Sequence, residues 1–309
     1  MALLIIAPDI KPTSWIKHLG ELEPGIEIRV WPEVGNSREV EFALCWNHPP
    51  GELSKYKNLK CIASLGAGVD HLTRDPHLPD SVPVTRVVEE SMAQSMSEYV
   101  VLSVLNYCRQ FDAYRTDQDQ RHWQPRKPRL AEDTLIGIMG LGQLGSDAAK
   151  KLRYIGFRVS GWSRTPKKIN GVQCFAGKDG FKNFLSRSQI LICLLPLTPW
   201  TKGILNRKTF DQLPDAAYVI NVARGQHLVE NDLIAALDSG RLAGACLDVF
   251  DVEPLPVSHP FWRHPKIKVT PHISSITFPK AVAPQIIENY RRAKTGRPLL
   301  NVVDLKRGY

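Results

Sequence analysis

The fold of this 309-residue chain is decided by one stretch of its sequence, TLIGIMGLGQLG at residues 134–145. An apolar, strand-like run leads directly into Gly140, Gly142 and Gly145, and residues 146–155 continue with a helical pattern. Between a strand and a helix, glycines at this spacing allow a tight turn, close backbone approach to a pyrophosphate, and close helix–strand packing. The stretch therefore predicts a dinucleotide-binding unit; the alternative is an ordinary glycine-rich turn.

Strand-like runs alternate with helical patterns on both sides of this turn, as they do in parallel βαβ units. The apolar runs are nearly continuous, which is typical of strands that helices cover on both faces. We therefore expect an α/β fold with two doubly wound parallel sheets. The expected strands are 3–7, 26–31, 41–46, 59–65 and 82–88 in the first series, and 134–140, 158–162, 190–196, 217–223, 243–250 and 267–271 in the second. Long helices are expected at 89–111, before a polar segment at 112–133, and at 279–296.

The strand that follows the glycine turn ends in positive charge. A dinucleotide fold that prefers NADH carries an acidic residue about twenty residues after the turn, where it binds the ribose 2′-hydroxyl. Here the strand ends in Ser163 and Arg164, with Lys167 close behind, and no acidic residue stands between Asp147 and Asp179. Arginine and serine can bind a 2′-phosphate through charge-assisted hydrogen bonds. The sequence thus favours NADPH over NADH, unless these side chains only face water.

Three polar residues follow three later strand-like runs. Arg224 follows the run 217–223, Glu253 follows 243–250, and His272 follows 267–271. Ligands of open parallel sheets bind beyond the carboxyl ends of the strands, so we expect these side chains to meet. Histidine can supply a proton near neutral pH, a carboxylate can orient it, and a guanidinium can polarise a carbonyl and hold a carboxylate. Taken singly, each residue also has a purely structural interpretation, and only the combination indicates catalysis.

With these residues the chain resembles the D-isomer-specific 2-hydroxyacid dehydrogenase family, and within it most closely the bacterial glyoxylate and hydroxypyruvate reductases. The similarity covers nearly the whole length. It rests on SLGAGVD (64–70), HWQP (122–125), GWSRTPK (161–167), LLPLTPWTKGILN (194–206), NVARGQHLVENDLIAALDSG (221–240), LDVFDVEPLP (247–256) and VTPHIS (269–274).

The resemblance implies a role for each matching residue. His272 would be the proton donor, Glu253 its partner, and Arg224 the residue that binds the substrate. The remaining matches are Ala67, Gly68 and Val69 for the substrate carboxylate, Gln143 and Leu144 for the pyrophosphate, Leu195, Pro196 and Thr201 for the dinucleotide loop, and Ala223 and Asp248 for the nicotinamide end. Trp46, at the end of its strand, could form the wall of the substrate pocket, or it could be an ordinary packing residue.

The resemblance also implies a domain plan and a reaction. A flavodoxin-like substrate domain at 1–97 plus 274–309 would carry an inserted Rossmann cofactor domain at 98–273. The chain would form a homodimer and reduce small 2-keto acids such as glyoxylate and hydroxypyruvate with NADPH. Trp123 could reach the partner subunit's active site, or it could simply pack in the core or at an interface.

Two residues qualify this resemblance. The related formate dehydrogenases carry glutamine where Glu253 stands, so the glutamate favours keto-acid chemistry with a proton donor. Asn47 is an insertion relative to the subgroup and could alter the substrate pocket. The alternatives are therefore a reductase for a bulkier 2-keto acid such as phenylpyruvate, or a non-catalytic nucleotide sensor on the same fold.

Composition excludes several other classes of protein. The net charge of +9 is dispersed along the chain, so nucleic-acid binding is the weakest interpretation. No apolar run is long enough to cross a bilayer, and the first residues, MALLIIAP, do not have the pattern of a signal peptide, so we expect a cytoplasmic protein. The six cysteines include no Cys-x-x-Cys pair and no histidine at ligand spacing, so neither a disulfide framework nor a metal site is expected.

Overall fold

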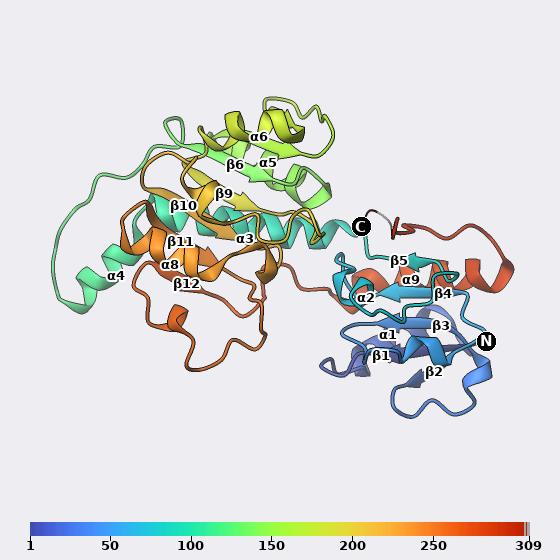
Figure 1. The fold of residues 1–309 in the computed structure, drawn as a ribbon. Coiled ribbons are helices and arrows are strands. Elements are labelled where there is room, and N and C mark those ends of the chain that lie inside the picture. The colour runs from blue at the N-terminus through green and yellow to red at the C-terminus, as the bar shows by residue number, and fades with distance from the viewer. Residues whose placement is uncertain (306, 308–309) are drawn as a thin grey trace. The chain divides into compact units, whose positions relative to one another are not determined.

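The computed structural model describes residues 1–305 and 307, which form two compact units with one parallel sheet each (Figure 1). Unit 1 consists of Met1–Ser91 and the chain from Thr277 onward, and unit 2 consists of Met92–Ile276. The predicted α/β class with two parallel, helix-covered sheets is confirmed. In the described part of the chain, no helix combines the length and the apolar character that a membrane span requires.

Unit 1 has a five-stranded sheet in the order β2-β1-β3-β4-β5, the strand order of flavodoxin-like folds. Its strands are β1 (Ala2–Ile6), β2 (Glu27–Val30), β3 (Val40–Cys45), β4 (Cys61–Ser64) and β5 (Val84–Thr85). Its helices are α1 (Thr13–Leu22), α2 (Asp70–Thr73) and α9 (Pro279–Thr295), with short 3-10 turns at Ser37–Glu39 and Leu53–Lys55. The core between them is mostly aliphatic, and β1 is completely buried because it lies between β2 and β3.

Unit 2 has a seven-stranded sheet in the order β12-β11-β10-β9-β6-β7-β8, which is a Rossmann sheet extended by one strand. Its strands are β6 (Leu135–Met139), β7 (Arg158–Ser163), β8 (Gln173–Ala176), β9 (Ile190–Cys193), β10 (Ala217–Asn221), β11 (Leu242–Leu247) and β12 (Ile267–Val269). Its helices are α3 (Glu90–Cys108), α4 (Phe111–Asp119), α5 (Gln143–Ile155), α6 (Gly177–Leu185), α7 (Arg207–Phe210) and α8 (Glu230–Asp238), with 3-10 turns at Gly225–His227 and Pro260–Trp262.

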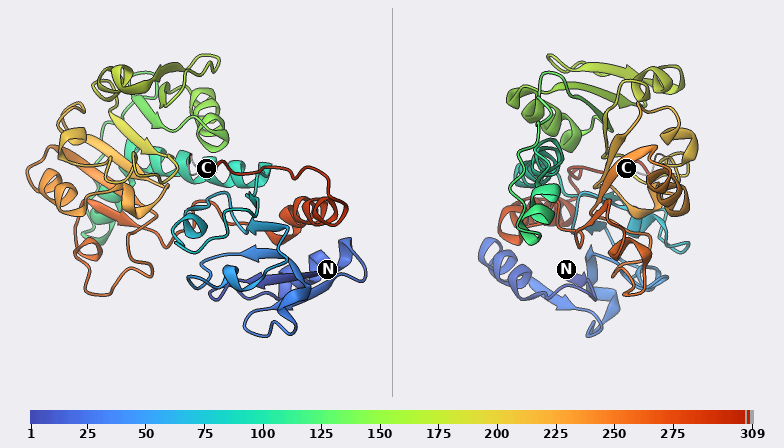
Figure 2. Two further views of the ribbon diagram at one scale, coloured as in Figure 1. Left: turned by 45° about the vertical axis from the view of Figure 1, so that its right-hand side comes forward. Right: turned by 90° about the vertical axis from the view of Figure 1, so that its left-hand side faces the viewer.

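Helices cover both faces of the unit 2 sheet, which explains its continuous apolar strands. Ile190 and Ile192 of β9 pack into one core cluster with α3 and α5, whereas Leu191 and Cys193 pack into the cluster that contains α6 and α8. The green α3 and α5 and the orange α8 accordingly lie on opposite sides of the strands in the right-hand view of Figure 2. Because all the strand pairings of this sheet are parallel, its strands all end at the same edge. The loops beyond that edge carry the candidate site.

Several elements differ from the sequence-based expectation. Helix α5 begins at Gln143, three residues earlier than expected, so part of the glycine turn is already helical. The polar segment after α3 contains a helix of its own, α4, and β8 was not expected. Strands such as β9 stop before the apolar run does, because residues 194–196 turn into the loop that follows the strand.

Candidate functional site

The glycine turn has one open position between two closed ones. Gly140 has a φ of +101°, and a Cβ there would lie 2.6 Å from the Leu194 carbonyl oxygen. A Cβ on Gly145 would lie 1.8 Å from the Gly140 carbonyl oxygen, so this glycine seals the helix against the strand. A Cβ on Gly142 would meet nothing within 4 Å. The turn therefore leaves space for a ligand at Gly142 alone.

The amino end of α5 faces this open position without a side-chain cap. Its first helical hydrogen bond runs from Ser146 N–H to the Gly142 carbonyl over 2.9 Å. The N–H groups of the preceding residues, among them Gln143 and Leu144, point forward from the helix end and have no carbonyl four residues back within the helix. Such groups, together with the helix dipole, bind phosphate anions. The predicted pyrophosphate residues thus have the geometry that an anion requires.

The end of β7 carries the residues predicted to bind a 2′-phosphate. Ser163 is buried, and its hydroxyl donates to the Thr165 carbonyl over 2.8 Å, which shapes the turn. Arg164 and Lys167 follow on the exposed side of that turn. The structure therefore presents the two cations at the surface, while the serine hydroxyl already has a partner.

The loop after β9 is closed by a threonine. The Thr201 hydroxyl donates to the Pro196 carbonyl over 2.7 Å and accepts from the Thr198 N–H over 2.9 Å. Leu195 is buried at the start of this loop. Thr201 thus fixes the shape of the loop that the sequence analysis assigned to the dinucleotide.

A glycine brings the loops after β10 and β11 into contact. A Cβ on Gly225 would lie 1.9 Å from the backbone carbon of Phe250 and 2.2 Å from the Asp251 nitrogen. The loop that carries Arg224 can therefore touch the loop that carries Glu253 only because residue 225 is glycine. Gly225 was not among the residues predicted from the sequence; its position directly after the arginine was the available signal.

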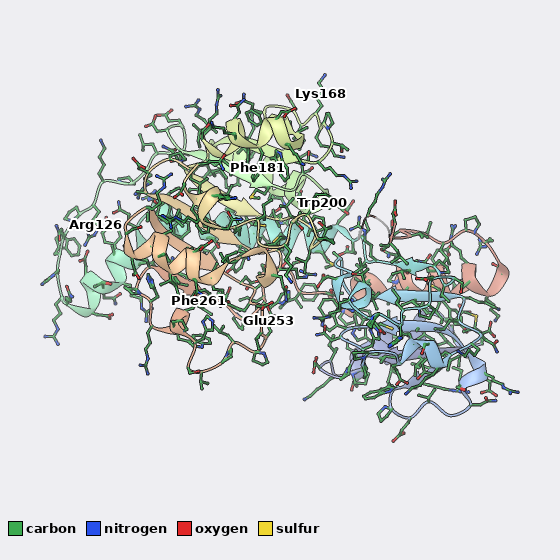
Figure 3. The ribbon with its side chains drawn as sticks, viewed as in Figure 1. Arg126, Lys168, Phe181, Trp200, Glu253 and Phe261 are labelled. Atoms are coloured by element: carbon green, nitrogen blue, oxygen red, sulfur yellow. The ribbon has the colours of Figure 1, made fainter. Side chains whose placement is uncertain are left out.

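His272, the predicted proton donor, and Glu253, its predicted partner, form a hydrogen-bonded pair. His272 Nδ1 and Glu253 Oε2 are 2.8 Å apart, and the two side chains are 34% and 36% exposed. The other carboxylate oxygen accepts the Phe250 N–H over 2.9 Å. Glu253, labelled in Figure 3, extends from the loop beyond β11.

The carboxyl group of this pair is held in its charged form. Desolvation by burial raises the pKa of Glu253, but the hydrogen bonds from His272 and the Phe250 N–H, and then the charges of His272 and Arg224, lower it further. The net pKa lies below the ordinary value, so the carboxylate is ionised at neutral pH. A carboxylate hydrogen-bonded to one ring nitrogen fixes the orientation of the imidazole.

Asp248 organises the segment that carries the histidine. Its carboxylate is fully buried and accepts hydrogen bonds from the Thr270 hydroxyl and from the N–H groups of Ile273 and Ser274, over 2.6, 2.9 and 2.8 Å. His272 N–H donates to the Asp248 carbonyl over 2.8 Å. This role was not predicted, because the resemblance to the dehydrogenase family implied only that Asp248 contacts the nicotinamide end.

His272 itself has a left-handed backbone, with a φ of +54°. Residues other than glycine seldom adopt this conformation, and it persists only where the surrounding contacts enforce it. The contacts from Asp248 on both sides of His272 supply that constraint. The imidazole is therefore directed by its backbone as well as by Glu253.

Arg224 is positioned by buried polar side chains on its own loop. Its backbone N–H donates to His227 Nδ1 over 3.2 Å, and its carbonyl accepts the Asn221 amide over 3.0 Å. The guanidinium donates to the carbonyl of the buried Ala223 over 2.6 Å. Arg224 is thus held at the end of β10, which neighbours β11, and its charge acts on Glu253.

The predicted substrate residues of unit 1 lie together at the ends of β3 and β4. The rings of Trp46 and His71 have centroids 4.6 Å apart, and a Cβ on Gly66 would meet the Trp46 ring at 2.7 Å. The indole therefore lies against the loop that continues as Ala67, Gly68 and Val69. Arg224, Glu253 and His272 belong to unit 2.

Asn47 is exposed and has a φ of +46°. Its side-chain oxygen accepts a hydrogen bond from Arg74 over 2.7 Å.

Trp123, on the segment after α4, is 97% exposed. Among the described residues, His, Cys, Asp and Glu side chains form no group of three that could hold a metal ion.

Comparison with known proteins places this chain among dehydrogenases. The model of the family described as D-isomer specific 2-hydroxyacid dehydrogenase, NAD binding domain, matches residues 101–274. The chain is 44% identical over its full length, and over the full length of the relative, to glyoxylate/hydroxypyruvate reductase A of Serratia proteamaculans. It is 43% identical, again over both full lengths, to the protein of that name from Yersinia enterocolitica.

Two solved structures are similar over the whole chain. One is a D-isomer specific 2-hydroxyacid dehydrogenase from Xanthobacter autotrophicus in complex with NADPH and MES, with a TM-score of 0.95, 43% identity, and coverage of 100% of this chain and 99% of the other. The second is an NADPH-dependent glyoxylate/hydroxypyruvate reductase from Sinorhizobium meliloti in complex with NADP and sulfate, with a TM-score of 0.94, 37% identity and full coverage of both chains.

Proposed function

Because the chain belongs to the D-isomer specific 2-hydroxyacid dehydrogenase family, we propose that it reduces small 2-keto acids with NADPH. Glyoxylate would yield glycolate, and hydroxypyruvate would yield D-glycerate. The observation that carries the proposal is the 2.8 Å pair of His272 and Glu253 beyond the sheet that also carries the glycine turn. Relatives named for these two substrates support the choice of substrate class.

NADPH fits the residues on the dinucleotide side of unit 2. Gly142 leaves open space in front of the uncapped end of α5, which suits a pyrophosphate. Arg164 and Lys167 beyond β7 suit a 2′-phosphate. When bound, the reduced nicotinamide supplies the hydride that is transferred to the substrate carbon. Complexes of similar proteins with NADPH and NADP support this choice of cofactor.

His272 is the proposed proton donor. Nδ1 faces Glu253, so Nε2 is the nitrogen that can give its proton to the carbonyl oxygen as negative charge develops there. The ionised Glu253 keeps the proton on Nδ1, holds the ring and stabilises the imidazolium. The planar guanidinium of Arg224 polarises the keto group and binds the substrate carboxylate in a fork that lysine could not reproduce.

The substrate residues of unit 1 are proposed to act on the acid itself. Successive backbone N–H groups of Ala67, Gly68 and Val69 would bind the carboxylate, as such groups bind anions in other loops. Trp46, packed on Gly66, would limit the size of the side chain that the site accepts. Small keto acids are therefore the preferred substrates over phenylpyruvate.

We also propose that the protein works as a cytoplasmic homodimer. All six cysteines are free and five are buried, which suits a reducing compartment. Trp123 is 97% exposed, and Phe111 and Tyr114 of the preceding helix α4 are exposed aromatic residues too, which suits burial of this region against a partner subunit. Light scattering measures the molar mass of the purified protein in solution. A strictly monomeric protein would contradict the proposed dimer.

One paired assay tests the function. Oxidation of NADPH and of NADH is followed with glyoxylate, hydroxypyruvate, pyruvate and phenylpyruvate at equal concentrations. We expect the highest kcat/KM for the combination of NADPH with either glyoxylate or hydroxypyruvate. A best rate with phenylpyruvate would replace the substrate assignment. Tight NADPH binding without turnover of any acid would indicate a nucleotide sensor.

A further inference from the structure

We propose that Lys178 and Trp200 complete the binding site for the adenosine end of the cofactor. In this proposal Lys178 binds the 2′-phosphate and Trp200 stacks on the adenine ring. The inference rests on the proposed use of NADPH and assigns two residues that lie outside both the glycine turn and the Ser163–Lys167 turn.

Lys178 lies next to the end of β7 although it follows a different strand. In the parallel pairing of β7 with β8, Ser163 is the partner of Ala176, and Lys178 comes two residues later, in the first turn of α6. The indole N–H of Trp162 donates to the Gly177 carbonyl over 2.8 Å, which ties the start of α6 to β7. A Cβ on Gly177 would meet nothing within 4 Å, so space is open beside this turn.

Trp200 reaches the same place from the loop after β9. The Lys178 ammonium lies 5.9 Å from the centre of the Trp200 ring, near the outer limit of a cation–π contact. The strand order is β9-β6-β7-β8, so a contact between the loops after β9 and β8 must span the ends of β6 and β7. Those two ends are the glycine turn and the Ser163–Lys167 turn. The pair therefore encloses the position where the adenosine would lie.

The two side chains have the chemistry that this position requires. Trp200 is 86% exposed, so most of its ring remains available for stacking on a base. Figure 3 labels it on the loop after β9, in the same unit as Lys168 on the loop after β7. A lysine in the first turn of α6 is unfavourable for the helix dipole, whereas Asp179 beside it is favourable. An anion bound between Lys178, Arg164 and Lys167 would offset that unfavourable charge.

The test measures binding of two cofactor fragments to the full chain by calorimetry. Adenosine 2′,5′-bisphosphate carries the 2′-phosphate, and adenosine 5′-monophosphate does not. Lys178→Gln should weaken the bisphosphate about fivefold and the monophosphate less than twofold, because one of several charge-assisted contacts to the 2′-phosphate is lost. Trp200→Leu should weaken both ligands by a similar factor of roughly ten, because both contain the adenine ring.

Matched variants control for indirect effects. Lys182→Gln removes the same charge one helical turn further along α6, about 6 Å away, and should change both affinities less than about twofold. Trp200→Phe keeps an aromatic face and should restore most of the affinity lost in Trp200→Leu. Quenching of the indole fluorescence by either ligand should shrink in Trp200→Phe compared with the unmodified chain.

The outcomes separate this inference from the proposed function. Equal affinity of the unmodified chain for both fragments would contradict the choice of NADPH. A bisphosphate preference that survives Lys178→Gln, or that falls equally in Lys182→Gln, would overturn the role of Lys178. Unchanged binding in Trp200→Leu would overturn the stacking role.

Discussion

The two halves of the unit 2 sheet edge hold their side chains in different ways. Beyond β10, β11 and β12, the site depends on contacts between residues far apart in the chain: Asp248 with Ser274, Gly225 with Phe250, and Glu253 with His272. Beyond β6 and β7, the site depends on one short turn and on exposed cations such as Arg164. The half with the proposed catalytic residues, called the catalytic half below, is a constrained network. The half with the proposed cofactor residues, called the dinucleotide half, is a local motif with charge spread over several side chains.

This difference indicates in which half the function is sensitive to single amino-acid substitutions. In a network, each polar group is the partner of another, so the loss of one leaves the next misplaced or unsatisfied. In the dinucleotide half, neighbouring cations would share one phosphate ligand, so the remaining cations would partly compensate for the loss of one positive charge. We therefore expect large effects of single substitutions beyond β10–β12 and small ones beyond β7.

The largest effect is expected for His272→Asn. Asparagine tolerates the left-handed backbone at this position, so the variant removes the proton donor with little strain. We expect kcat with glyoxylate to fall by about 10²–10⁴, which is the usual contribution of a positioned general acid. The dissociation constant of NADPH, measured by fluorescence, should stay unchanged because the dinucleotide half is untouched. A fall in kcat below about tenfold would remove His272 from the role of proton donor.

The second effect is expected for Glu253→Gln. Glutamine cannot stabilise a positive charge on the imidazole, so kcat with glyoxylate should fall by about 10–10². A control is the conservative Glu253→Asp, which keeps the negative charge and should lose less of the kcat than Glu253→Gln does. An unchanged kcat in Glu253→Gln would contradict the proposed role of Glu253 as the partner of His272.

The same variant makes a prediction for stability. The folded pKa of Glu253 is lowered, so its contribution to stability is complete above the ordinary carboxyl pKa of about 4.3 and is lost as pH falls through the lower folded value. The difference in Tm between the unmodified chain and Glu253→Gln should therefore be constant from neutral pH down to about pH 4.3 and should shrink below it. A difference that grows on acidification would reverse the sign of the shift.

Much of the fold was predictable because it depends on local patterns. The glycine turn and the apolar strands in TLIGIMG and AYVINVA identify the sheet, since buried parallel strands need continuous apolar residues. By contrast, β8 was missed because its four residues are only partly buried at the sheet edge, and α4 because its sequence is mostly polar.

The features of the candidate site fall into the same two groups, those that local sequence patterns indicate and those that they do not. Arg224, Glu253 and His272 could be proposed from the sequence because each follows a recognisable strand, and the resemblance to a family implied a role for each. The buried contacts of Asp248, the close approach at Gly225 and the backbone conformation of His272 were not predictable, because they arise from tertiary contacts that no local pattern encodes.

A matched pair of glycine variants tests the local character of the dinucleotide half. A methyl group on Gly145 collides with the Gly140 carbonyl, so Gly145→Ala should lower the free energy of unfolding by about 2–3 kcal/mol. A methyl group on Gly142 meets no protein atom, and its φ of −73° suits alanine, so stability should change by less than about 0.5 kcal/mol.

Ligand binding should rank the same pair differently. The Gly142→Ala methyl group occupies the space proposed for the pyrophosphate, so the dissociation constant of NADPH should rise about tenfold, equivalent to about 1.4 kcal/mol. Denaturant unfolding and NADPH titration of both variants measure the two quantities. Normal NADPH affinity in a stable Gly142→Ala protein would mean that the turn does not approach the ligand.

The smallest effect is expected for Arg164→Gln. Lys167 and Lys168 follow on the same exposed turn, so the 2′-phosphate would keep other cations nearby. The ratio of kcat/KM for NADPH over NADH should fall only about fivefold, less than the loss of an isolated charge-assisted contact would cause. The effect should be larger at low salt, because exposed charges are screened as ionic strength rises. If the preference for NADPH instead vanished with this one change, the phosphate would depend on a single fixed contact, and the dinucleotide half would be a constrained network like the catalytic half.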